Sequence, residues 1–379
     1  MRIVSVVGTR PQLIKAAALS PVLRERHDEV FVDTGQHWDE SLAGSFFAEL
    51  ALARPDVSLD GGGGTHAEQT ARMLRGVEEV VLRERPDAVL VYGDTNSTLA
   101  GTLAAAKLVT PVAHVEAGLR SFDRSMPEEV NRIVADHLAR WRFAPTPTAV
   151  ANLAAEGLRD GVELVGDLMQ DLAARVSREV RDPRVLDGVA RAALEPGRFL
   201  FATIHRAENR LPESVRRWTA LLRTVAAPDR PVILALHPGT RAVLDRDVDT
   251  LGADVVVVEP LGYRTSLALQ LHAAAVLTDS GGVQREAAWL GTPCLVLRST
   301  TEWVEAVETS GGRMAVIGLD ADRAVRELAR LAPLDAAANL AIRRAATLAL
   351  APAGAADAIA GRLAIDEAQP AGAGSPAFR

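Results

Sequence analysis

Short apolar segments in the first third of the chain end abruptly in polar or charged groups. Four of them lie at residues 3–7, 30–32, 88–92 and 112–115. Short apolar runs of this kind are typical of buried strands. In an open parallel sheet, the carboxyl ends of the strands open onto one crevice, where ligands bind. The unlike charges that follow these strands therefore predict a reaction site in that crevice.

Helical segments alternate with the strands along almost the whole chain. The spacing predicts helices over residues 11–25 and 67–85, and the alternation restarts after Asp167. The predicted strands of the second half lie at 199–203, 231–236, 254–258, 275–278 and 294–297. Such alternation favours parallel β-α-β units over sandwiches or bundles. We predict an α/β protein with two similar halves and a cleft between them.

The length of 379 residues is too great for one ordinary core and suits two domains. We place the first domain at residues 1–167 and the second at 168–352. A C-terminal helix or tail at 353–379 can pack back on the first domain. From Gln369 onward, the proline, alanine and glycine content predicts a frayed end.

Composition limits the function classes. The chain is 48% hydrophobic with a net charge of -7, so we expect a soluble protein and no nucleic-acid partner. Cys294 is the only cysteine, which excludes an intramolecular disulfide and a cysteine metal cluster. The first residues lack signal-peptide features, and the apolar stretches fall short of the ~20 residues that span a bilayer. We expect a cytoplasmic protein with no membrane partner.

Ser280, Gly281 and Gly282 give the sharpest phosphate signal, because they follow a predicted strand and open a helix over residues 283–289. The glycines let a ligand approach the backbone, and a helix amino end offers free N–H groups. A serine-capped helix after a tight turn is an equally good interpretation of the motif alone. Glu286 can hold ribose hydroxyls, although such a residue is more often a solvated helix charge.

Positive groups and a histidine stand at other strand ends. Arg10 can balance ligand phosphate, and Lys15 can add to it, although a lone helix lysine is more often a surface side chain. His205 can donate a hydrogen bond to phosphate or act as an acid near neutral pH. The four-glycine run at 61–64 favours a flexible turn over a phosphate cradle.

Asp94 and Glu116 follow strongly apolar strands and are candidates for proton transfer. A partly desolvated crevice can raise the pKa of a carboxyl group. The plainer alternative is that each carboxylate caps a helix or pairs with Arg120.

Glu128 has a stronger structural alternative. Ser125 and Pro127 together predict a capping box that includes it, and an exposed pair of Glu128 with Arg132 is also plausible.

Several motifs now make a family resemblance specific. They are Gly8-Thr9-Arg10-Pro11, Gly35-Gln36-His37, Tyr92-Gly93-Asp94-Thr95-Asn96, His114-Val115-Glu116-Ala117-Gly118-Leu119-Arg120, Pro127-Glu128-Glu129, His205-Arg206-Ala207-Glu208-Asn209 and Asp279-Ser280-Gly281-Gly282. In this order, over residues 1–318, they resemble the non-hydrolysing UDP-N-acetylglucosamine 2-epimerases. The resemblance implies a GT-B-like fold, with two Rossmann-like domains and the nucleotide sugar between them.

The resemblance also implies an activity. UDP-GlcNAc would be inverted at C2 to UDP-ManNAc by elimination and re-addition of UDP through a 2-acetamidoglucal intermediate, with no cofactor and no metal. A homodimer is expected. Residue by residue, the catalytic positions fall on Asp94, Glu116, Glu128 and His205. The UDP contacts fall on Arg10, Ser280, Gly281, Gly282 and Glu286, with Lys15 and Arg132 as supporting cations. The resemblance does not assign which carboxylate removes the proton.

Some residues depart from the family pattern. Gln12 stands where many relatives have glutamate, and with residues 301–305 it resembles a branch that acts on modified or oxidised UDP-amino sugars. Residues 38–40 and 61–64 differ where some bacterial relatives form an activating second UDP-GlcNAc site, so we expect this activation to be absent or weak. The alternatives are a hydrolysing 2-epimerase, an epimerase of a modified UDP-amino sugar, a GT-B glycosyltransferase and a non-catalytic nucleotide-sugar sensor.

Overall fold

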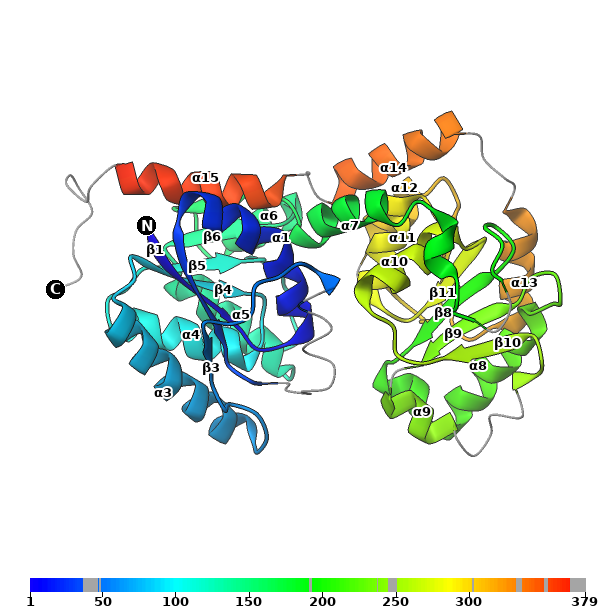
Figure 1. The fold of residues 1–379 in the computed structure, drawn as a ribbon, viewed down its shortest axis with the longest axis horizontal. Coiled ribbons are helices and arrows are strands. Elements are labelled where there is room, and N and C mark those ends of the chain that lie inside the picture. Colours follow the sequence, from blue (N-terminus) through cyan, green and yellow to red (C-terminus); the bar gives the residue numbers. More distant parts are fainter. Residues whose placement is uncertain are drawn as a thin grey trace. The chain divides into compact units, whose positions relative to one another are not determined.

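Two compact units make up the chain in the computed structural model (Figure 1). The first unit comprises Met1–Leu172 with Ala351–Arg379, and the second comprises Ala173–Leu350. The structure describes residues 1–36, 47, 49–190, 193–236, 238–244, 251–301, 303–331, 336–350 and 354–368. The expected activator region at 38–40, with His37, and the tail from Gln369 lie outside these residues.

The first unit is built on a seven-stranded parallel sheet of order β3-β2-β1-β4-β5-β6-β7. Its strands are β1 (Arg2–Val7), β2 (Asp28–Asp33), β3 (Val57–Ser58), β4 (Ala88–Tyr92), β5 (Val112–Val115), β6 (Trp141–Ala144) and β7 (Val162–Leu164). Its helices are α1 (Arg10–Arg26), α3 (His66–Glu84), α4 (Asn96–Lys107), α5 (Pro127–Leu138), α6 (Pro147–Ala155) and α15 (Ala355–Ala368), and α7 (Leu168–Glu179) leads into the second unit.

The second unit has a six-stranded parallel sheet of order β10-β9-β8-β11-β12-β13. The strands are β8 (Leu200–Ile204), β9 (Val232–Leu236), β10 (Val255–Val258), β11 (Ala275–Thr278), β12 (Cys294–Val296) and β13 (Met314–Val316). The helices are α8 (Pro212–Val225), α9 (Pro238–Leu244), α10 (Tyr263–His272), α11 (Gly281–Leu290), α12 (Val304–Thr309), α13 (Ala321–Arg330) and α14 (Ala336–Leu350), with 3-10 turns η1 (Pro183–Leu186) and η2 (Ala207–Arg210).

Both sheets reverse their strand order at one point, as Rossmann-like sheets do. In the first unit β1 lies between β2 and β4, and Ile3 is opposite Glu29 on one side and Ala88 on the other. In the second unit β8 lies between β9 and β11. Ligands of open α/β sheets bind at the carboxyl ends of the strands beside such a reversal. The loops after β1, β4, β8 and β11 are therefore the places to look for a site.

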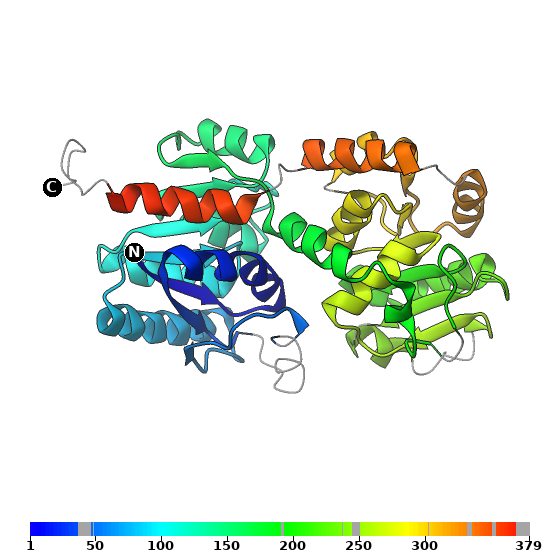
Figure 2. The same cartoon turned by 45° about the horizontal axis from the view of Figure 1, so that its top comes forward.

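Each unit has its own apolar core. Valines of β1, β2 and β4 pack against α3 and α4 in the first unit, while α15 lies beside α1 (Figure 1). In the second unit, α8 and α13 pack on the β8, β9 and β11 side chains. Helices α11 and α14 pack against each other there (Figure 2). The many valines in these cores fit a parallel sheet, because β-branched residues favour strands and the strands of a parallel sheet are buried on both faces.

The α/β prediction is confirmed, and most predicted elements lie within two residues of their observed bounds. The predicted helix 11–25 is α1, which Thr9 and Gln12 begin with a capping box. Strands β3, β6, β7 and β13 were not predicted. Each has at most four residues, and Arg142 and Glu163 interrupt the apolar pattern of β6 and β7. Runs this short carry little periodicity.

Helix α15 belongs to the first unit although it lies at the end of the chain. Ile359 and Leu363 are fully buried, and the ring nitrogen Nε2 of His27 lies 3.0 Å from the carbonyl oxygen of Ala360. By length and composition, the stretch Ala337–Ile365 would pass for a membrane-spanning helix, contrary to our expectation, and 40% of its apolar window is buried. Buried helices of soluble proteins pass the same test, so this is weak evidence for a membrane.

Candidate functional site

Glu116 forms an ion pair with Lys15 at the carboxyl edge of the first sheet. Glu116 follows β5 in the left-handed conformation, with a φ of 71°. Its carboxylate accepts a hydrogen bond from Lys15 Nζ, and both side chains are largely buried. Two simpler interpretations are therefore wrong: Lys15 is not a surface lysine, and Glu116 does not pair with Arg120.

The loop that carries Asp94 lies directly against this ion pair. Gly93 has a φ of 61°, and a Cβ atom there would lie 3.1 Å from Glu116 Oε2 and 3.4 Å from Lys15 Nζ. The Asp94 carboxylate forms an ion pair with Arg132 of α5, and its side chain is 32% exposed. The structure thus gathers two carboxylates and two cations at the end of β4 and β5, and each acid has a cation as its partner.

Glu128 is exposed near the start of α5, and neither of its plainer interpretations holds. The N-cap of α5 is Met126, which makes no side-chain cap, and the Ser125 hydroxyl donates instead to Asp123 at 2.6 Å. Arg132 bonds to Glu129 at 2.9 Å rather than to Glu128. The predicted capping box is wrong because Met126 is the N-cap and the Ser125 hydroxyl bonds to Asp123. The predicted Glu128–Arg132 pair is wrong because Arg132 pairs with Glu129 and Asp94.

Glu129 is a buried residue that sequence reasoning did not single out. It accepts hydrogen bonds from the backbone N–H groups of Ser121 and Phe122 at 2.9 and 3.0 Å. Burial alone would raise the pKa of Glu129, but these hydrogen bonds and the Arg132 charge outweigh it and lower that pKa. Glu129 therefore stays ionised and orients Arg132 toward Asp94. The paired glutamates at the start of α5 were the available signal.

Gln12 ties the end of β1 to the end of β4. Its side-chain oxygen accepts from the Gly8 N–H at 2.9 Å, and its Nε2 donates to the Tyr92 carbonyl at 2.7 Å and to the Thr98 hydroxyl at 3.0 Å. An ionised glutamate could not donate to that carbonyl. The residue that departs from many relatives thus has a structural role beside the site.

The fully buried side chain of His114 contacts the loop that follows β4 at the same edge of the sheet. His114 places Nε2 at 2.7 Å from the Gly93 carbonyl oxygen and Nδ1 at 2.7 Å from Asp136 Oδ1. Asp136 also binds Arg120, which in turn pairs with Glu156. Burial alone would raise the pKa of Asp136, but the charges and hydrogen bonds of His114 and Arg120 outweigh it and lower that pKa. This network fixes the backbone beside Asp94 and Glu116.

Arg10 and an open groove are two further features of the first unit that lie near the loops after β1 and β4. Arg10 is exposed as the first residue of α1, immediately after the loop that follows β1. The groove has a volume of about 580 Å³ and is lined by His66, Ala67, Thr70, Ala71, Asn96, Leu99, Pro127, Val130 and Asn131. Asn131 donates to the Asp94 carbonyl at 2.9 Å, so the groove borders the Asp94 loop.

Ser280, Gly281 and Gly282 open helix α11 in the second unit. Ser280 is its N-cap, as the plainer interpretation held, and its hydroxyl faces the Val283 N–H at 3.5 Å. A Cβ atom on Gly281 would lie 2.9 Å from Trp303 Nε1, so this position needs glycine. Glu286 is buried and accepts a hydrogen bond from Gln270 at 2.7 Å. Glu286 is therefore not a solvated helix charge.

His205 lies after β8 and meets Asp279, which lies after β11. Its Nδ1 is 2.8 Å from Asp279 Oδ1. These two loops stand at the strand reversal of the second sheet. Asp279 belongs to the Asp279-Ser280-Gly281-Gly282 motif, but no role was predicted for it.

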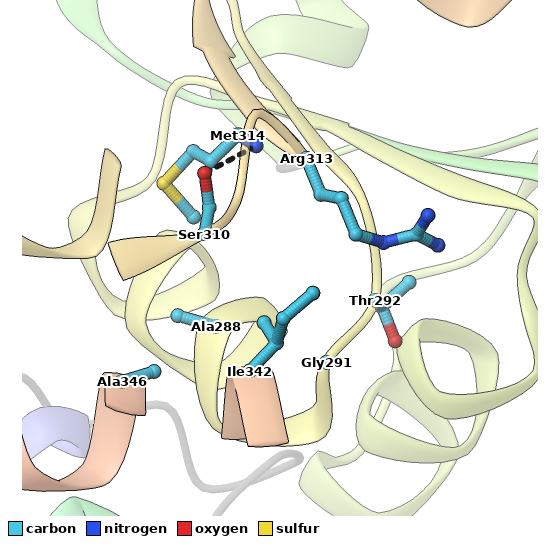
Figure 3. A pocket seen from close by; sticks show the side chains of 8 residues that line it. All are labelled: Ala288, Gly291, Thr292, Ser310, Arg313, Met314, Ile342 and Ala346. Carbon is cyan, nitrogen blue, oxygen red and sulfur yellow. Dashed lines mark hydrogen bonds between the residues drawn. The ribbon is translucent and has the colours of Figure 1, made fainter. Parts of the chain in front are cut away.

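A small cavity in the second unit is too small to be a nucleotide site. It lies between α11, β13 and α14 (Figure 3), and its volume is about 10 Å³, which is room for one water molecule. The lining residues are Ala288, Gly291, Thr292, Ser310, Arg313, Met314, Ile342 and Ala346. Among the residues that the structure describes, no three His, Cys, Asp or Glu side chains gather as metal ligands.

Comparisons with known proteins agree on one family. Residues 22–347 match the family model of UDP-N-acetylglucosamine 2-epimerase. The UDP-2,3-diacetamido-2,3-dideoxy-D-glucuronate 2-epimerase of Pseudomonas aeruginosa is 45% identical over 83% of this chain and 88% of its own. The UDP-N-acetylglucosamine 2-epimerase of Methanocaldococcus jannaschii is 38% identical over 86% of this chain and 91% of its own.

Solved structures agree as well. The Methanocaldococcus jannaschii UDP-GlcNAc 2-epimerase in complex with UDP-GlcNAc and UDP matches with a TM-score of 0.77 and 35% identity, over 96% of this chain and 100% of the other. The calicheamicin glycosyltransferase CalG4 matches with a TM-score of 0.56 and 17% identity, over 97% and 99% of the two chains, which shows the fold alone. The chain has a GT-B-like fold and belongs to the UDP-N-acetylglucosamine 2-epimerase family.

Proposed function

We propose that the protein inverts C2 of UDP-GlcNAc to give UDP-ManNAc without net hydrolysis. The observation that carries this proposal is the juxtaposition of Asp94 and Glu116 at the carboxyl ends of the neighbouring strands β4 and β5, each beside a cation. Inversion at one carbon requires a proton to leave from one face of the sugar and to return to the other. Two carboxylates on adjacent loops supply two proton-handling groups.

The C2 hydrogen of the sugar has no carbonyl beside it, so direct removal would be very costly. In the proposed reaction a base takes the C2 proton, and the C2–H electron pair becomes the C1=C2 double bond. The C1–oxygen bond breaks, and its electron pair leaves with UDP. A proton then returns to C2 from the opposite face while the diphosphate oxygen of UDP attacks C1. Glu128, which is exposed on α5, is a third candidate for one of these transfers.

The nucleotide contacts follow from the same proposal. The amino end of α11, with Ser280, Gly281 and Gly282, offers backbone N–H groups to the diphosphate. Glu286, held by Gln270, accepts from ribose hydroxyls, and Arg10 adds positive charge. Lys15 and Arg132 keep the two candidate acids paired until substrate arrives. His205 serves as the acid near the diphosphate.

A modified substrate is the second candidate. The Pseudomonas aeruginosa relative, at 45% identity, is named for UDP-2,3-diacetamido-2,3-dideoxy-D-glucuronate. Gln12 and residues 301–305 also resemble the branch that acts on such sugars. The elimination chemistry at C1 and C2 is the same for both sugars, so the two candidates differ only in what surrounds C3 and C6.

Proton NMR in heavy water tests the proposal with both sugars, by following the C2 hydrogen and the anomeric signals. Formation of UDP-ManNAc with deuterium at C2 and little free UDP is the expected result. Free ManNAc with UDP would indicate the hydrolysing reaction, and turnover of the diacetamido glucuronate alone would assign the modified substrate. Retention of the C2 hydrogen in both sugars would exclude epimerisation.

Light scattering of the purified protein tests the homodimer that we also propose, and fractionation of cells tests the proposed cytoplasmic location.

A further inference from the structure

Asp279 carries a carboxylate that is fully buried at the strand reversal of the second sheet. Among the residues that the structure describes, the donors to this carboxylate belong to the segment that follows β8. The backbone N–H of His205 lies 3.1 Å from each carboxylate oxygen, and that of Arg206 lies 2.9 Å from Oδ2. Asn209 Nδ2 donates at 2.8 Å, and His205 Nδ1 lies at 2.8 Å. One side chain thus organises the whole His205 loop.

This surrounding keeps Asp279 ionised. Burial alone would raise the pKa of Asp279, but the hydrogen bond and charge of His205, with the hydrogen bonds from Asn209 and Arg206, outweigh it and lower that pKa. An ionised carboxylate can only accept hydrogen bonds. His205 Nδ1 must therefore carry a proton when it faces Asp279, because the bond that one ring nitrogen makes sets the state of the other.

The opposite ring nitrogen remains available. The His205 side chain is 41% exposed, and its Nε2 makes no hydrogen bond with any residue in the described part of the chain. We propose that Asp279 is a positioning residue, which holds the His205 ring by Nδ1–H so that Nε2 is the atom offered to the substrate. Asp279 also joins this ring to the loop that begins α11, since Ser280 is the next residue.

The charge of Asp279 argues for this role. A carboxylate one residue before a diphosphate loop would repel the anion if it were not neutralised. Here its charge is satisfied by the His205 loop, so the loop and α11 form one assembly. During elimination, protonated His205 gives its Nε2 proton to the departing diphosphate oxygen and recovers it on re-addition, while the Nδ1 proton stays on the ring. This step rests on the function proposed above, but the arrangement of the ring does not.

The first test is the nitrogen-15 spectrum of the histidine rings in the wild-type protein, with and without UDP. His205→Gln identifies the signals by their loss. At a pH where the ring is neutral, we expect a single tautomer with Nδ1 protonated and Nε2 bare. A neutral ring with its proton on Nε2 would overturn the proposal. This measurement needs no turnover, so it decides the matter even if neither UDP-sugar is a substrate and the proposed function fails.

The second test is Asp279→Asn, with Asp320→Asn as the matched control. Asp320 caps α13 by accepting from the Arg323 N–H at 2.8 Å, far along the chain from both loops. We expect Asp279→Asn to lower kcat by about a hundredfold or more, with KM and the Kd for UDP within about tenfold of the control. The His205 signals should show a mixture of tautomers. Equal kcat in the two variants would contradict the proposal, and if Asp279→Asn does not fold, the wild-type spectrum decides alone.

Discussion

Lys15 of α1 and Glu116 after β5 form a largely buried ion pair, with side chains that are 10% and 14% exposed. Removing one partner leaves the other charge buried and unpaired, which costs roughly 3–5 kcal/mol. We expect Lys15→Met and Glu116→Gln each to lower the free energy of unfolding by about 3 kcal/mol. The double variant should lose less than the sum.

Urea denaturation of the four proteins in a double-mutant cycle measures this coupling. Glu79→Gln is the control, because Glu79 pairs with Arg75 at the surface, where both side chains are largely exposed. Its effect should stay within about 0.5 kcal/mol. Additive losses in the double variant would show that Lys15 and Glu116 do not stabilise each other.

Asp94 and Glu116 should matter for turnover much more than for nucleotide binding. Both lie in the first unit, whereas the proposed diphosphate loop lies in the second. Asp94→Asn and Glu116→Gln should change the affinity for UDP by no more than about tenfold, which is ~1.4 kcal/mol. Both substitutions should lower kcat by a much larger factor. Calorimetry with UDP and the NMR assay give the two quantities. Near-native turnover in both variants would remove these residues from the mechanism.

Asp136 should give the first unit a pH-dependent stability. Because its pKa is lowered in the folded protein, its contribution is present above the unfolded value of about 3.9 and is lost as the pH falls through the lower folded value. Asp136→Asn should therefore cost about 3 kcal/mol near pH 7, and the difference from wild type should shrink below about pH 4. Denaturation across this range, with Asp320→Asn as the control, measures it. A constant difference at all pH values would contradict the assignment.

Helix α15 should be needed for the stability of the first unit. Leu363 is fully buried, whereas Ile365, two residues further along, is 57% exposed. Leu363→Ala should lower the free energy of unfolding by about 3 kcal/mol, and Ile365→Ala should change it by less than about 0.5 kcal/mol. Thermal and urea unfolding of both variants provide the comparison. Equal effects would mean that α15 does not pack on the unit as described.

Cys294 should be inert in the folded protein. Burial raises the pKa of its thiol to about 12, so at pH 8 roughly one thiol in ten thousand is ionised. A chromogenic disulfide reagent should react slowly with the native protein and fully in guanidinium. Rapid native labelling would show that Cys294 is accessible.

The sequence allowed the charged strand ends to be predicted, but not their partners. Asp94 and Glu116 stand directly after apolar runs, which is a local signal. Arg132 was assigned to Glu128 because helix spacing relates only residues three or four apart. Its actual partner Asp94 is 38 positions away and comes near only through the order of the sheet.

Buried polar residues were the harder part to predict. Asp136 and Asp279 look like ordinary acids in the sequence, and their roles come from hydrogen bonds to distant loops. The sequence around Gln270 likewise does not indicate its hydrogen bond to Glu286. Strand patterns carry no information about such pairs.

The return of α15 to the first unit affects the order in which the protein can fold. Ribosomes release Met1–Leu172 first, yet Ile359 and Leu363, which complete that unit's core, emerge only after the whole second unit. Domains generally fold as units during synthesis. The second unit can therefore reach its native state while the nascent first unit still exposes the apolar side of α1. During this interval the apolar side of α1 is a surface that a chaperone can bind.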